Sequence, residues 1–393
     1  HGAAFGLLAY QSTWLRVHYG PEFLCSLMNE QPMGFYPPDA LVHEAQRRGI
    51  EVLPPDMNAS EVECGIDADG RVRIGLGYVR GVRRQEVEEI VAAREAGGRF
   101  HNLAALASRA GAGASSLELL AWSGACDSLA VQEAEAENGR AGADEGRAWA
   151  DEGRTDRAAG AARRIALWQL GVATPGVGVA GGTQLALPLD LPAPPPLRDL
   201  SAWESMLADY GTTGLTTHAH PLALLRERLP AGVSSSRDLE TRDHGTLVRA
   251  AGLVVARQRP GTANGIVFVL LEDEFGTINL IVPAAVYERH RLTVRTEPLV
   301  FIEGKLERFA AAGGAINVLV QRIAPIATPD RPLAEVKDFS MLDELERRRI
   351  AHGKAAAGAA GAAASGQAAA SGSPEDFRAV APPVMSFASG RRR

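Results

Sequence analysis

Apolar residues recur at helical spacing at the start of the chain. Phe5, Leu8 and Leu15 lie about one or two turns apart, and the apolar positions of 23–28 continue the pattern. Gly20-Pro21 lies between the two sets, and this pair interrupts a helix. The pattern therefore predicts two consecutive helices within residues 3–30.

The pattern between residues 31 and 130 is mostly helical. A proline-rich connection at 31–38 precedes it. The predicted elements are a helix from its cap Asp39 to about Arg48, a strand at 50–53, a hairpin at 62–74 turning at 67–70, and helices with glycine-marked turns at 75–130.

Residues 246–326 change to the alternating and β-branched patterns of strands. Three strands, a short helix and two further strands within about 80 residues follow the order of an OB-fold barrel. Phe268 and Phe301 are expected to fill the interior of this barrel. The predicted strands are 247–256, 266–271, 277–282, 298–309 and 315–323, with the helix at 283–291.

Three segments lack a clear apolar pattern. Residues 131–162 hold five Glu and three Asp against four Arg, with few large apolar residues. Such a segment buries too little apolar surface to offset its ordering entropy, so it is predicted to be a disordered insertion. A helix at 163–170, a linker to about residue 196 and two small helices within 200–230 follow. The tail from 329 is predicted to be mostly disordered, apart from a helix at 341–350.

Composition narrows the classes of protein. The 393 residues are 46% hydrophobic, with a formal net charge of −6. The insertion carries −4 of this charge, so the acidity does not exclude a nucleic-acid partner. No apolar run reaches about 18 residues, so no membrane partner is expected. The cysteines Cys25, Cys64 and Cys126 are far apart, which favours a reducing cytoplasm over a disulfide or zinc scaffold.

No catalytic or metal-binding motif is recognisable. His218 and His220 have no acidic residue or cysteine at ligand spacing, so a helix-capping turn before 222–229 is expected. Asp67 and Asp69 lie within the predicted hairpin turn, where such residues are common without any catalytic role.

The segment 74–82 has the pattern of a helix-hairpin-helix turn. Glycine permits close approach of a phosphate, and the next helix directs its N-terminal amides toward the anion. An ordinary turn between packed helices remains the alternative, and a second, weaker copy lies at 119–125. The candidate DNA-binding residues are Gly77, Arg80, Gly81, Arg83 and Arg84.

The barrel region has candidates for binding a single strand, in which aromatic rings stack on bases and arginines follow the backbone. Residues 246–328 hold nine Arg and Lys against seven Asp and Glu, so the region is only weakly basic. A role in protein contacts therefore stays open. The candidates are Arg257, Arg259, Phe275 and Arg308.

Several strings, in order along the chain, resemble one family. They are His1–Arg16, Tyr19–Leu24, Gln31–Pro37, Arg163–Leu170, Gly214–Leu222 and Asp376–Arg378. They are similar to the C-family bacterial DNA polymerases, and Gln31–Pro37 resembles the error-prone, damage-inducible branch of that family. The resemblance covers most of residues 1–130 and 163–330.

The resemblance implies a multidomain α+β region of an enzyme that acts in damage-induced mutagenesis and translesion synthesis. Its parent would be a nucleotidyltransferase that uses Mg²⁺ held by palm-domain aspartates upstream of His1. The chain is therefore expected to be a C-terminal part that does not polymerise alone. The alternative is a protein-docking scaffold region of the replicative polymerase III α subunit. The implied divisions are fingers at 1–50, helix-hairpin-helix at 51–130, insertion at 131–162, linker at 163–245, OB-fold at 246–328 and tail at 329–393.

The resemblance also implies partners: primer-template DNA, single-stranded DNA, and accessory proteins of translesion synthesis. One short apolar run in the glycine- and proline-rich linker is similar to the peptides by which bacterial proteins bind the sliding clamp. A chance apolar patch that packs locally is the alternative. The clamp-binding candidates are Gln184, Leu185, Leu187 and Leu189.

Overall fold

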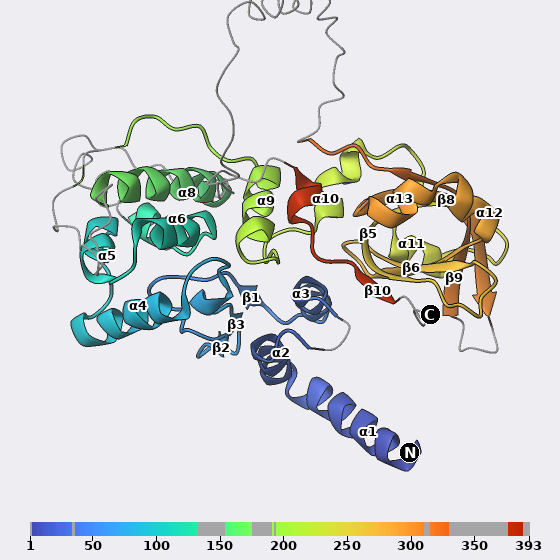
Figure 1. Cartoon of the computed structure of the whole chain (residues 1–393), viewed down its shortest axis with the longest axis horizontal. Helices are drawn as coiled ribbons and strands as arrows, with labels where there is room; N and C mark the ends of the chain where they lie inside the picture. Colours follow the sequence, from blue (N-terminus) through green and yellow to red (C-terminus); the bar gives the residue numbers. More distant parts are fainter. Residues whose placement is uncertain are drawn as a thin grey trace, which may run out of the picture.

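The computed structural model describes residues 2–33, 36–132, 154–174, 191, 194–309, 315–329 and 376–387. Figure 1 shows a helical half and a β-barrel half, with α9 and α10 between them. Among the described residues, no helix combines the length and apolar character required to cross a bilayer.

Three helices begin the chain: α1 (Gly2–His18), α2 (Gly20–Asn29) and α3 (Pro38–Arg47). α1 extends outward from α2 and buries none of its residues (Figure 1). The prediction that Asp39 caps α3 is wrong, because Pro37 is the N-cap. Asp39 is instead buried, and its carboxylate accepts hydrogen bonds from the Tyr210 hydroxyl at 3.0 Å and the Thr216 amide at 3.3 Å.

A small three-stranded sheet follows, built from β1 (Val52–Leu53), β2 (Gly65–Ile66) and β3 (Val72–Arg73). β3 is central, parallel to β1 and antiparallel to β2. The predicted hairpin is confirmed. Its turn closes at Gly70, whose φ of +79° favours glycine.

A helical bundle forms the rest of this half. Its elements are η1 (Leu76–Tyr78), α4 (Arg84–Gly97), α5 (Leu103–Arg109), α6 (Ala114–Trp122) and α8 (Arg154–Ala173). Their apolar faces share one core that includes Ile90, Leu106 and Leu120. α8 begins at Arg154 rather than at the predicted Arg163, so part of the predicted insertion is helical.

Short elements connect the bundle to the barrel: α9 (Ala202–Thr212), α10 (Pro221–Leu225), η2 (Arg226–Arg228), β4 (Val233–Ser234) and α11 (Ser236–Thr241). His220 is the N-cap of α10, and its Nδ1 accepts a hydrogen bond from the Leu222 amide at 3.1 Å. The predicted capping turn at this histidine is therefore confirmed.

The predicted barrel is present. Its strands are β5 (Leu247–Gln258), β6 (Val267–Glu272), β7 (Thr277–Val282), β8 (Leu299–Phe309) and β9 (Ala315–Pro325). The order β5-β6-β7-β9-β8 is closed by antiparallel pairing of β8 with β5. β7 and β9 run parallel, and α12 (Ala284–Arg289) and α13 (Arg291–Thr296) lie between β7 and β8 in sequence. Aliphatic side chains fill the interior.

A segment near the C-terminus packs on α9 and on the barrel. α15 (Phe377–Val380) inserts Phe377 against the rings of Trp203 and Tyr210 in α9. β10 (Met385–Phe387) pairs in parallel with residues Ala256–Gln258 of β5. These elements lie in the tail for which mostly disorder is predicted. The predicted helix at 341–350 lies outside the described residues.

Candidate nucleic-acid interface

The outer face of the barrel carries two rows of side chains, set by strand register. Cross-strand pairing aligns Gln258, Phe268 and Ile281 in one row. The second row aligns Ala256, Leu270, Asn279 and Asn317 across four strands. Because side chains alternate between the two faces of a strand, all of these residues point away from the barrel interior.

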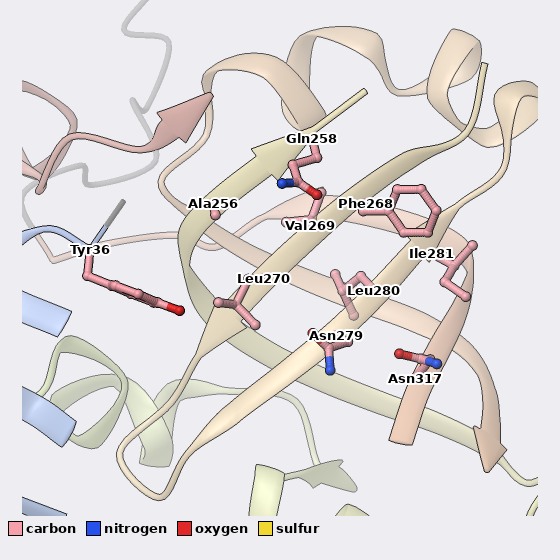
Figure 2. Close-up of a pocket in the computed structure, with 10 residues that line it drawn as sticks. All are labelled: Tyr36, Ala256, Gln258, Phe268, Val269, Leu270, Asn279, Leu280, Ile281 and Asn317. Atoms are coloured by element: carbon pink, nitrogen blue, oxygen red, sulfur yellow. The ribbon is translucent and has the colours of Figure 1, made fainter. Parts of the chain in front are cut away.

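These rows form the floor of an open groove of about 660 Å³. Figure 2 shows the Phe268 ring at one side of the groove and the Tyr36 ring at the other, on the side of Ala256 and Leu270. Tyr36 is 61% exposed and Phe268 38% exposed. Asn279 and Asn317 add amide groups to the floor (Figure 2). Aromatic rings with exposed faces beside amide donors and acceptors are suited to stacking on bases and bonding their edges.

Phe268 departs from the sequence prediction. It was expected inside the barrel, but its neighbours Val267 and Val269 point inward and leave Phe268 outside. Phe301 is likewise only half-buried, while Ile302 fills the interior. A solid β-branched run does not reveal which alternate set faces inward, and this explains the error.

Arg257 and Arg308 lie away from the groove. The Arg257 guanidinium donates to the Glu297 carbonyl, and burial lowers the pKa of Arg257 to about 10. Arg308 donates to the carbonyls of Leu239 and Arg242 at the end of α11, at 3.0 and 2.8 Å. Both arginines are therefore engaged in holding neighbouring segments to the barrel.

Arg259 and Phe275 also lie outside the groove lining. The Arg259 guanidinium stacks 4.5 Å from the Tyr287 ring centre and lies 3.9 Å from Glu288. Phe275 is 42% exposed in the β6–β7 turn, and Arg237 stacks on its ring at 4.6 Å. The structure thus brings none of the four predicted barrel residues into the groove.

The groove residues that sequence reasoning missed are Tyr36, Gln258, Asn279, Ile281 and Asn317. A signal was present in β7, where Asn279 interrupts the apolar residues of 278–282. An amide in such a position indicates a strand face that is open to solvent or ligand.

The predicted helix-hairpin-helix turn is built on a 3₁₀ turn, η1, followed by α4. A Cβ atom at Gly77 would lie 2.6 Å from the Val62 carbonyl oxygen, so close packing requires glycine there. The Gly77 amide donates to that same oxygen at 2.8 Å. Gly81 has a φ of +83° and is exposed, so it supplies the reversal of the chain before α4.

The Glu86 carboxylate occupies the space at the N-terminus of α4 where a phosphate was expected to bind. Buried Glu86 accepts hydrogen bonds from the Arg83 guanidinium, the Ser116 hydroxyl at 2.6 Å and the Gly113 amide at 3.1 Å. The hydrogen bond from Arg83, with those from Ser116 and Gly113, lowers the pKa of Glu86 to about 2. A phosphate would therefore meet the exposed face of this turn beside Arg80 and Arg84 rather than the space that Glu86 fills.

The three arginines of the turn differ in their partners. Arg83 pairs with Glu86 at 3.0 Å, and Arg84 pairs with Glu63 at 2.7 Å and Glu88 at 2.9 Å. Arg80 is exposed, and no carboxylate of the described residues forms an ion pair with it. Its charge is therefore the most available to a phosphate.

The second, weaker turn contributes to packing. Gly124 has a φ of +83° after α6. The buried Arg163 guanidinium lies beside it, pairing with Asp127 at 3.3 Å and Asp209 at 2.9 Å. The turn is thus tied to α8 and α9 by buried ion pairs.

One buried cluster has the residue types of a metal site. Ligand atoms of His43, His220 and Glu272 lie within 4.8 Å of one another. Arg47 already pairs with Glu272 at 2.8 Å, and Nδ1 of His220 accepts from the Leu222 amide. Neutral His220 therefore carries its proton on Nε2, which opposes coordination through that atom. The cluster is better suited to joining α3, α10 and β6.

Asp39 and His43, at the contact between α3 and the barrel, affect each other's pKa values. Burial raises the pKa of Asp39 to about 6, against the effect of nearby His43. Burial lowers the pKa of His43, but the carboxylates of Asp39 at 3.6 Å and Glu272 at 3.4 Å outweigh it and raise the pKa overall. His43 thus lies between two acidic groups at the boundary between the halves.

The clamp-binding candidates Gln184, Leu185, Leu187 and Leu189 lie outside the described residues.

Comparisons with known proteins agree with this architecture. Residues 49–136 match the helix-hairpin-helix motif family, and residues 248–326 match the OB-fold nucleic acid binding domain family. The error-prone DNA polymerase of Dechloromonas aromatica (strain RCB) is 36% identical over 329 residues, covering 83% of this chain and 28% of the relative. That of Burkholderia pseudomallei (strain K96243) is 40% identical over 314 residues, covering 77% and 26%.

The chain is a homologue of the error-prone DNA polymerases. It spans slightly more than a quarter of the length of the curated error-prone polymerases that it matches. Among solved structures, asparaginyl-tRNA synthetase from Pyrococcus horikoshii aligns with a TM-score of 0.22 at 22% identity, over 32% of this chain and 29% of that chain.

Proposed function

We propose that this chain is the DNA-handling region of an error-prone, DNA-directed DNA polymerase. The exposed turn at Gly81 and Arg80 would contact the backbone of primer-template duplex, and the groove between Tyr36 and Phe268 would hold single-stranded template. The observation that supports this proposal best is the groove, where exposed rings and amides converge on one face of the barrel.

The parent enzyme would add nucleotides during damage-induced translesion synthesis. That chemistry uses Mg²⁺, which prefers oxygen ligands. The buried cluster of His43, His220 and Glu272 offers mainly nitrogen ligands and has Arg47 beside its carboxylate, so it does not fit Mg²⁺. We therefore place the catalytic metal ions outside the described residues and expect no primer extension by this chain alone with Mg²⁺ and dNTPs.

Binding of labelled oligonucleotides tests the groove directly. We expect the chain to bind single-stranded DNA with an affinity that falls steeply as salt increases. Phe268→Ala should weaken this binding by about tenfold, because it removes a stacking surface worth about 1–3 kcal/mol. Phe275→Ala is the matched control and should bind as the unaltered chain does. Absence of DNA binding at low salt would favour the protein-docking alternative.

A second partner is proposed for the linker. The run from Gln184 to Leu189 would bind the sliding clamp as a short extended peptide. A clamp pull-down with Gln184→Ala combined with Leu187→Ala should recover much less clamp than the unaltered chain. Equal recovery would show that the clamp, if it binds at all, uses another surface.

A further inference from the structure

A second cavity lies between the first three helices and the barrel. Its volume is about 550 Å³, within the range of small-molecule sites. Phe23, Leu27 and Leu41 line it from the helices, and Val255 and Leu270 line it from the strands. This junction cavity is thus mainly apolar, with walls from both halves of the molecule.

The junction cavity lies next to the barrel groove. Tyr36 and Leu270 line both spaces, so one aromatic ring stands where the two meet. Figure 2 shows that ring at the helix side of the groove, beside Leu270. A strand that follows the groove from Phe268 toward Tyr36 would therefore reach the mouth of the cavity.

The polar groups of the cavity suit a nucleotide. Arg16 of α1 lines it and is exposed, and no carboxylate of the described residues forms an ion pair with Arg16. Thr277 and Glu44 also line it. Burial raises the pKa of Glu44, but hydrogen bonds from Arg48 and Arg47 outweigh burial and lower the pKa overall. The apolar walls would contact the faces of a base, the polar residues at the cavity would hydrogen-bond to the edge of the base, and the Arg16 guanidinium would bind its phosphate.

We propose that the junction cavity takes one unstacked nucleobase from the strand held in the barrel groove. Tyr36 stacks on the base that precedes it, and Arg16 contacts the adjoining phosphate. This inference rests on the proposed single-strand function of the groove. Extraction of a base from its stack costs a few kcal/mol in a duplex and least in a strand that is already single.

Photocrosslinking locates the base. Oligonucleotides that carry one 4-thiothymidine at successive positions are bound to the full chain and irradiated, and the linked peptides are mapped by mass spectrometry. One position should link to Phe23 or Met33 in the cavity, while neighbouring positions link to Tyr36 or Phe268. Links confined to groove residues at every position would overturn the inference.

A cavity-filling variant gives an independent readout. Ala40 lines the cavity, so Ala40→Phe places a ring where the base would lie. Affinity for the single strand should fall by about tenfold, the equivalent of one stacked base, and links to Phe23 and Met33 should disappear. Ala92→Phe, on an exposed position of α4, is the matched control and should have no effect.

The outcomes separate this inference from the proposed function. If Ala40→Phe binds normally while Phe268→Ala loses affinity, the groove holds DNA and the cavity does not take a base. If the unaltered chain binds no single strand, the proposed function itself fails, and the cavity inference fails with it. Equal unfolding profiles of Ala40→Phe and the unaltered chain are required to assign the loss to the cavity.

Discussion

At the scale of residues, an arginine can bind a DNA phosphate most readily when no carboxylate already pairs with it. Of the arginines at the helix-hairpin-helix turn, Arg83 and Arg84 are already paired with carboxylates, and Arg80 is not paired with any described carboxylate. A paired arginine must exchange one anion for another when it binds phosphate, so its net gain is small. The sequence shows three equivalent cations, whereas the structure distinguishes them.

Charge reversal at the turn tests this distinction. Arg80→Glu should weaken binding of primer-template duplex by about tenfold at low salt and reduce the slope of log affinity against log salt by about one. Arg84→Glu should have a smaller effect, since Glu63 and Glu88 already offset its charge. Fluorescence anisotropy over a series of salt concentrations measures both. Equal losses for the two variants would contradict the assignment to Arg80.

At the scale of elements, the spacing of apolar residues and the residues typical of turns were sufficient to predict most of the helices and strands. The five barrel strands and the hairpin at Gly70 follow from alternation and turn residues, and both are confirmed. The groove was not predictable in the same way. Its floor depends on which alternate face of β6 points outward, and its Tyr36 wall comes from a segment more than 200 residues away in sequence.

Long-range contacts also explain the wrong assignment of Asp39. Its position before a helix is typical of a cap, but Tyr210 and Thr216 hold its carboxylate in the interior. No local pattern reveals partners about 170 residues away. Arg257 is a similar case. The sequence predicts that it contacts a phosphate, but in the structure its guanidinium donates to the Glu297 carbonyl, a partner that no local pattern reveals.

The start of α4 provides a pH-dependent element. The folded pKa of Glu86 is about 2, below its ordinary value of 4.5. The stabilisation of the folded state by ionised Glu86 is therefore fully present above about pH 4.5 and is lost as the pH falls toward 2. Glu86→Gln should lower the free energy of opening α4 by about 2 kcal/mol at neutral pH.

Hydrogen exchange of the α4 amides, followed across pH, measures this free energy. Glu88→Gln on the same helix is the control and should change it by less than about 0.5 kcal/mol, because Glu88 is exposed. The difference between the unaltered chain and Glu86→Gln should shrink below pH 4.5. A difference that persists unchanged at pH 3 would show that packing, not ionisation, carries the effect.

At the scale of the whole molecule, buried polar contacts join the two halves. Asp39 of α3 meets Tyr210 of α9, and His43 of α3 meets Glu272 of β6. These contacts thus connect the part of the molecule that holds the turn proposed to bind duplex with the barrel that holds the groove proposed to bind a single strand. Two sites held in this way act together on a ligand that spans both, because the second contact becomes intramolecular.

A junction of duplex and single strand tests this arrangement. A primer-template with a single-stranded template extension should bind at least tenfold more tightly than either the duplex or the single strand alone. Combining Arg80→Glu with Phe268→Ala should remove most of the advantage. Equal affinities for all three DNAs would mean that the two surfaces do not engage one molecule together.

The pairing of β10 with β5 has a consequence for the behaviour of the chain in solution. Without β10, residues Ala256–Gln258 would present unpaired amides and carbonyls at an open sheet edge. Such an edge is a template for strands of other molecules. The short C-terminal strand, anchored by buried Phe377, covers this edge. We expect shortened versions that end before residue 376 to self-associate, which light scattering would detect.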